Sequence, residues 1–118
     1  MSAVHLPYPP TADRLWSLEA GRIVRSAAYR AWLDTVRAAI RASTHPAVLG
    51  RFVLNITAHR PSEGEGAERD LDSLLAPLNA ALTAAGLVGD DSLAERIVVR
   101  WARKPEPGGQ LDVEARSA

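Results

Sequence analysis

The stretch at residues 51–60 reads RFVLNITAHR and is the clearest strand in the sequence. Every second side chain in it is apolar, which is the period of a strand with one buried face. The side chains expected on the buried face are Phe52, Leu54, Ile56 and Ala58. We therefore expect the rest of the fold to pack against that face.

Upstream of this strand, the sequence predicts a short strand, a hairpin and a helix. Residues 3–10 read as a strand that ends in prolines, which cannot donate to a sheet ladder. The hairpin has strands at 14–18 and 22–25. Ser26 is expected to cap a helix that runs to about Ser43, because apolar residues recur there at helical spacing. These residues are Tyr29, Leu33, Val36 and Ile40, with Trp32 on their flank.

Downstream, the sequence predicts an acidic loop, a second helix and two strands. Residues 61–68 combine Pro, Gly and Glu and are typical of a mobile loop. Helical spacing begins at Leu71 and stops at Gly86, a typical left-handed cap. Two last strands follow on either side of residues 107–109. Their expected inward side chains are Ile97, Val99 and Trp101 on the first and Leu111, Val113 and Ala115 on the second.

The last two strands are expected to pair with each other. In that arrangement Arg96 and Arg100 would meet Asp112 and Glu114 across the pair. The predicted fold is a small α+β domain, a mixed β-sheet with two main helices packed on it. No internal repeat or linker divides residues 1–118, so we expect a single domain.

Composition excludes several classes of protein. The 118 residues include 14 basic and 14 acidic side chains and no cysteine. Without cysteine there is no disulfide scaffold, thiol nucleophile, iron–sulfur cluster or Cys-based zinc site. No apolar run of the roughly 20 residues needed to cross a membrane is present, and no secretory signal opens the chain. We therefore expect no membrane association and a cytoplasmic location.

Charge is distributed unevenly along the chain. Residues 1–60 contain eight arginines and three acids, a net charge of +5, whereas residues 61–118 have a net charge of −5. This polarity suits a protein that grips phosphates with one surface and binds a cation with another. Uneven placement of ordinary solvated charges is the alternative. Arg30, Arg37 and Arg41 share one face of the first predicted helix. This face is either a phosphate-binding ridge or an ordinary solvated face with ion pairs between successive turns.

Carboxylates provide the strongest candidate for chemistry. Asp70-Leu71-Asp72 opens the second helix and Asp90-Asp91 follows it. A cluster of Asp oxygens selects a hard cation such as Mg²⁺ or Mn²⁺, which suits metal-assisted phosphodiester hydrolysis. Positions two apart in an α-helix point about 200° away from each other, so Asp70 and Asp72 can share an ion only if Asp70 precedes the helix. The alternative is that these residues only cap the helix and form a turn.

Other catalytic patterns are absent from the sequence. His5, His45 and His59 have no metal-ligand spacing, and we interpret each as structural. The sequence contains no Gly-rich phosphate loop, Ser-His-Asp trio or metalloprotease signature.

Taken together, these motifs resemble the RusA family of Holliday junction resolvases, small Mg²⁺-dependent endonucleases that are common in prophages. The resemblance covers nearly the whole chain. It is carried by Leu6-Pro7-Tyr8-Pro9-Pro10, by Arg69-Asp70-Leu71-Asp72, by Ala81-Leu82-Thr83-Ala84-Ala85-Gly86 and by Asp90-Asp91-Ser92, in that order.

The resemblance implies a function in DNA recombination and repair. Family members are homodimers that bind a four-way DNA junction and cut it symmetrically. The resemblance places the Mg²⁺ (or Mn²⁺) ion on Asp70, Asp72 and Asp91, with Asp90 as a supporting catalytic carboxylate. The arginines expected to contact DNA phosphates are Arg14, Arg22, Arg25, Arg30 and Arg69.

The chain also departs from the family pattern. An Asn, a Lys and an Asp of the family's second helix are replaced by Ser73, Ala76 and Ala80, and Asp13 stands where an Asn is common. The Lys is expected to stabilise charge on the phosphate, which alanine cannot do. Pro77 should also make the start of this helix irregular or kinked.

These departures leave two alternatives to a resolvase. The first is a catalytically degenerate RusA-like protein that binds branched DNA or a protein partner without cleavage. The second is a dimeric structural protein with Trp16, Leu18 and Trp101 as interface anchors.

Overall fold

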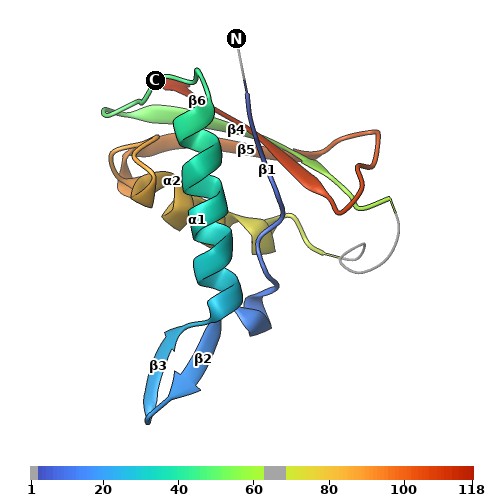
Figure 1. The fold of residues 1–118 in the computed structure, drawn as a ribbon. Coiled ribbons are helices and arrows are strands. Elements are labelled where there is room, and N and C mark those ends of the chain that lie inside the picture. Colours follow the sequence, from blue (N-terminus) through green and yellow to red (C-terminus); the bar gives the residue numbers. More distant parts are fainter. Residues whose placement is uncertain (1–2, 63–68) are drawn as a thin grey trace.

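The computed structural model describes residues 3–62 and 69–118. A four-stranded mixed sheet and two helices form the body, and a two-stranded hairpin extends away from it (Figure 1). The expected α+β class with two main helices is confirmed. Residues 63–68, which belong to the predicted acidic loop, lie outside the described residues. Within the described ranges, no helix is long and apolar enough to span a membrane.

The sheet has the strand order β1-β6-β4-β5. The central β4 (Phe52–His59) pairs antiparallel with β6 (Gln110–Ser117) and parallel with β5 (Ala94–Trp101). At the other edge, β1 (Val4–Leu6) pairs antiparallel with β6. The helix α2 (Leu75–Ala84) lies between β4 and β5 in the chain and supplies the crossover that a parallel pair requires.

The core lies between one face of the sheet and the helices. Leu54, Ile56 and Ala58 of β4 are completely buried or nearly so, as the alternation predicted. The helix α1 (Ala27–Ala42) crosses in front of the sheet in Figure 1. Its buried side chains are the predicted ones, Tyr29, Trp32, Leu33, Val36 and Ile40. Ser26 caps this helix by accepting a hydrogen bond from the Tyr29 N–H (3.0 Å).

The predicted pairing of the last two strands is wrong, because β4 lies between β5 and β6. Arg96 and Arg100 therefore do not face Asp112 and Glu114 across a strand pair. Arg100 is in register with Thr57 instead. The inward positions predicted for β6 are correct, because Leu111, Val113 and Ala115 are buried. On β5, Val99 and Trp101 pack partly buried against the core, but the prediction for Ile97 is wrong, since this side chain is 37% exposed on the edge strand.

The hairpin consists of β2 (Trp16–Glu19) and β3 (Arg22–Arg25) and forms a separate two-stranded sheet. Ala20 and Gly21 both have positive φ, at 51° and 76°, as a type I′ turn requires. Ser26 fixes the base of the hairpin, because its N–H donates to the Leu15 carbonyl and its Oγ donates to the Arg14 carbonyl. Figure 1 shows the hairpin projecting beyond the N-terminal end of α1.

The second helix begins irregularly, as Pro77 predicted. A 3₁₀ turn, η2 (Asp72–Leu74), precedes α2, and Pro77 is the third residue of α2, where its missing N–H costs little. Gly86 closes the helix end with φ of 79°, as expected.

Candidate functional site

Asp70 and Asp72 lie at the start of the second helix. Asp70 precedes the first helical turn, and its backbone carbonyl accepts a hydrogen bond from Ser73 Oγ (2.7 Å). Asp72 is the first residue of η2, and both carboxylates are exposed to solvent. The condition that Asp70 must lie before the helix is therefore met.

Asp90 and Asp91 lie beyond the other end of α2. Asp90 accepts a hydrogen bond from the Ser92 N–H (3.0 Å), and this bond holds the pKa of its carboxyl below the usual range. Asp91 begins the 3₁₀ turn η3 (Asp91–Leu93), which leads directly into β5. Asp90 thus acts as the cap of this turn, which is the structural alternative considered for it.

The structure does not gather the predicted ligands Asp70, Asp72 and Asp91 into one group. In the chain, the ten residues of α2, about 15 Å of helix, lie between Asp72 and Asp91. Val48 N–H donates to the Leu87 carbonyl (2.8 Å), which ties the chain after α2 to the segment before β4. Across residues 3–62 and 69–118, no three His, Asp or Glu side chains are grouped so that they could hold a metal ion. The residues present therefore do not fit the three-carboxylate Mg²⁺ site.

The start of α2 supplies no charge beside the aspartates. Ala76, where the resemblance leads one to expect a lysine, is exposed and carries no charge. The single lysine of the chain, Lys104, lies in the connection between β5 and β6.

The predicted DNA-contacting arginines lie on the hairpin, in the first turn of α1 and around a cavity beside it. Arg22 and Arg25 lie on the hairpin, and Arg30 lies in the first turn of α1. The Arg25 guanidinium lies over the Tyr29 ring, 5.7 Å from its centroid. Arg14 and Arg69 line a common cavity beside the start of α1. We call this group the arginine cluster; it consists of Arg14, Arg22, Arg25, Arg30 and Arg69.

Most of this cluster lacks a neutralising partner. Within the part of the chain that the structure describes, Arg22, Arg25, Arg30 and Arg69 have no carboxylate within salt-bridge distance. By contrast, Arg51 pairs with Glu95 (3.0 Å) elsewhere in the molecule. These four guanidiniums thus remain available to an anionic partner, with Arg22 and Arg25 on opposite faces of the hairpin and Glu19 across the strand pair from Arg22.

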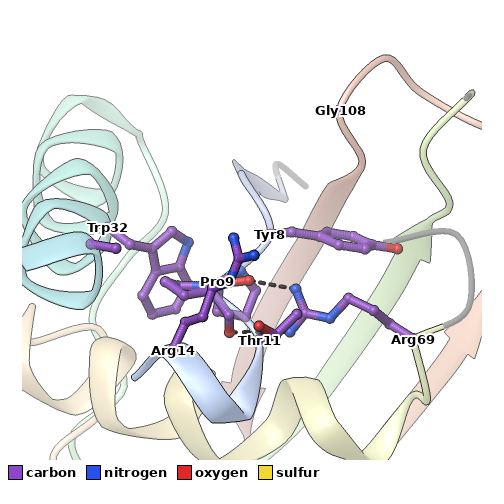
Figure 2. Close-up of a pocket in the computed structure, with 9 residues that line it drawn as sticks. Tyr8, Pro9, Thr11, Arg14, Trp32, Arg69 and Gly108 are labelled. Atoms are coloured by element: carbon purple, nitrogen blue, oxygen red, sulfur yellow. Dashed lines mark hydrogen bonds between the residues drawn. The ribbon is translucent and has the colours of Figure 1, made fainter. Parts of the chain in front are cut away.

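Arg69 is the most firmly held member of the cluster. Its two terminal nitrogens donate to the carbonyls of Pro9 and Pro10, and its guanidinium lies 5.5 Å from the centroid of the Tyr8 ring (Figure 2). Burial lowers the pKa of Arg69 from its ordinary value. Burial likewise raises the pKa of Tyr8, whose hydroxyl is buried and has no hydrogen-bond partner among the described residues.

A further polar group lies on the sheet face opposite the helices. Asp112 accepts hydrogen bonds there from His5 Nδ1 (2.6 Å), His59 Nε2 (2.7 Å) and Gln110 Nε2 (2.7 Å). Burial acts to raise the pKa of Asp112, but the hydrogen bonds from these three side chains lower it below its usual range. Because His59 Nδ1 also bonds to the Lys104 carbonyl (2.9 Å), both ring nitrogens of His59 donate, as in the charged imidazole. The Lys104 carbonyl, and then Asp112, raise the pKa of His59.

The sequence did not predict the contacts of Asp112 with His5 and His59. Alternation places His5, His59 and Asp112 on the outer face of their strands, so that signal was present. Their contact depends on β6 lying between β1 and β4, which the predicted strand order lacked.

Comparison with protein-family models and with curated proteins gives no match. The resemblance to RusA resolvases therefore rests on the sequence motifs alone.

Proposed function

We propose that the chain binds branched DNA through the arginine cluster without cutting it, as a catalytically degenerate RusA-like protein. The observation that carries this proposal is the placement of three of these arginines on the hairpin and the first turn of α1, with Arg14 and Arg69 at the neighbouring cavity. Neutralising phosphates with such groups releases counterions and drives binding to DNA. A DNA partner also agrees with the cytoplasmic location expected from the sequence.

Loss of cleavage is supported by the carboxylates and by α2. Asp70 and Asp72 precede this helix, whereas Asp91 follows it, and Ala76 carries no charge. Hydrolysis requires that the phosphate be held in position and that the charge developing on it be stabilised. The chain retains the acidic residues of the motif without their convergence.

A Mg²⁺-dependent junction endonuclease is the second candidate. It is favoured by the exposure of both Asp70, which precedes η2, and Asp72, which begins it, next to Arg69. This candidate requires Asp91, or another ligand, to reach the pair.

A homodimer fits the hairpin. Trp16 (53% exposed), Leu18 (73%) and Ile23 (76%) leave an apolar surface on it, where Leu18 and Ile23 are cross-strand partners. Isolated hairpins are marginal in water, so burying this surface against a second copy would stabilise it. Arg25, the cross-strand partner of Trp16, lies on the same face and would border such an interface, whereas Arg22 lies on the opposite face. Trp101, by contrast, packs against the core and under Arg60 (4.1 Å).

Incubating a labelled four-way junction with the protein in Mg²⁺ and in Mn²⁺ separates the two candidates. We expect retarded but intact junction, with the same result for Asp72→Asn. Paired symmetric nicks that disappear in Asp72→Asn would instead establish the endonuclease. If the junction is not retarded at all, both DNA functions are excluded.

A further inference from the structure

A cavity of about 350 Å³ lies between the segment that follows β1, the first turn of α1 and Arg69. Figure 2 shows Arg14 and Arg69 on opposite sides of Pro9, with Trp32 at one end. The lining residues are Tyr8, Pro9, Pro10, Thr11, Arg14, Ala28, Trp32, Arg69 and Gly108. This volume lies at the small end of the range for sites that bind one small molecule, about 300–1,000 Å³.

The charge of the cavity favours an anion. Its charged lining groups in the described chain are the two guanidiniums of Arg14 and Arg69, with no carboxylate. Arg69 is about half-buried, yet its hydrogen-bond acceptors are neutral carbonyls. A cation that is partly removed from water is stabilised by a charged partner. The carbonyls use two of the five guanidinium N–H groups, which leaves donors for an oxyanion.

Apart from Tyr8, Thr11 and Gly108, the rest of the lining is apolar. Pro9, Pro10, Ala28 and Trp32 form one wall, and the Trp32 indole is fixed by a hydrogen bond from its N–H to the Pro7 carbonyl (2.9 Å). Because such a wall is already ordered, binding a flat ring against it costs little conformational entropy. A ligand with an anionic end and a flat end, such as one nucleotide, suits both parts of the cavity.

We propose that the cavity receives one unstacked nucleotide of a DNA strand, with its phosphate at Arg69 and its base against the wall formed by Pro10 and Trp32. This inference rests on the proposed binding of DNA and specifies what that binding recognises. Unstacking a base costs least where pairing is already interrupted. The cavity therefore gives a physical reason for preferring branched DNA to intact duplex, which the arginine cluster alone does not.

The test fills the cavity without changing charge. Ala28 is exposed on α1 and lines the cavity, so Ala28→Phe should fold normally and block it. Ala38 is exposed on the same helix outside the lining, and Ala38→Phe is the matched control. The probes are thymidine 5′-monophosphate, an intact duplex and the same duplex with one unpaired nucleotide. Fluorescence anisotropy measures the DNA affinities, and the NMR shift of the Trp32 indole N–H reports the free nucleotide.

We expect wild type and Ala38→Phe to prefer the duplex with the unpaired nucleotide by about tenfold and to shift the Trp32 signal with the monophosphate. Ala28→Phe should lose both effects and keep the affinity for intact duplex. If Ala28→Phe retains the preference, the cavity inference is overturned while DNA binding stands. If the wild type binds no DNA, the proposed function fails, and a Trp32 shift in that case would assign the cavity to a free nucleotide instead.

Discussion

At the scale of single residues, what matters is which side chains the fold brings together. Asp112 joins histidines from two other strands, and Arg69 reaches the Pro9 carbonyl across sixty positions of sequence. Neither contact follows from spacing, since both depend on how distant segments meet. Asp70 lies before η2 and Asp72 begins it, which meets the condition for sharing an ion, whereas their predicted partner Asp91 follows α2 in the chain.

The contact between His59 and Asp112 predicts a pH-dependent stability. The lowered pKa of Asp112 adds stability that is present above its ordinary pKa of 3.8 and is lost as the pH falls through the folded value. The raised pKa of His59 adds stability that is complete below 6.5 and is lost as the pH rises through the folded value. Asp112→Asn should therefore reduce the free energy of unfolding most between these limits, by about 1–3 kcal/mol.

Urea denaturation of wild type and Asp112→Asn across this pH range checks the prediction. Glu114→Gln is the control, because Glu114 lies on the same strand and outer face. Its effect should vary much less with pH. A constant difference between wild type and Asp112→Asn would contradict the assigned charge of the pair.

At the scale of elements, the sequence pattern predicts which helices and strands form and which of their faces are buried. It predicts less well which strands pair with each other. Apolar residues recur at helical spacing in α1 and at every second position in β4. Each of these spacings fits a single kind of element, so it identifies the buried face. Strand order was wrong because the turn residues at 107–109 suggested a hairpin. The succession of β4, α2 and β5 already had the form of a strand–helix–strand crossover, which predicts a parallel pair.

Two leucines of different strands should respond differently to the same substitution. Leu54→Ala in β4 removes a side chain with 0% exposure and should lower the free energy of unfolding by about 2–5 kcal/mol. Leu18→Ala in the hairpin should change the stability of the isolated monomer by no more than about 0.5 kcal/mol. Thermal unfolding at low protein concentration measures both. A large loss for Leu18→Ala under these conditions would mean that the hairpin packs on the body of the same molecule.

The hairpin also predicts an effect on assembly. Ile23→Glu places a charge in the exposed apolar surface, so the proposed homodimer should dissociate to a monomer. Ala38→Glu on the outer side of α1 should leave it intact. Sedimentation velocity distinguishes the two states, and a wild-type chain that sediments as a monomer would exclude the dimer.

At the scale of the whole molecule, only part of the arginine excess predicted from residues 1–60 lies in one region. Of the eight arginines, Arg22, Arg25 and Arg30 lie on the hairpin and at the start of α1. Among the described residues of the second half, the acids form no group of three that could hold a metal ion, and α2 lies in the chain between the two aspartate pairs. Binding of phosphate without hydrolysis is the function that this distribution supports.

The salt dependence of junction binding tests that function most directly, with anisotropy of a labelled four-way junction as the measurement. If the five arginines of the cluster contact phosphates, the logarithm of affinity should fall against the logarithm of salt concentration with a slope of about −4.5. Arg25→Gln should make the slope shallower by about 1, whereas Arg116→Gln on β6 should leave it unchanged. A wild-type affinity that is independent of salt, or equal effects of the two substitutions, would contradict DNA binding by the arginine cluster.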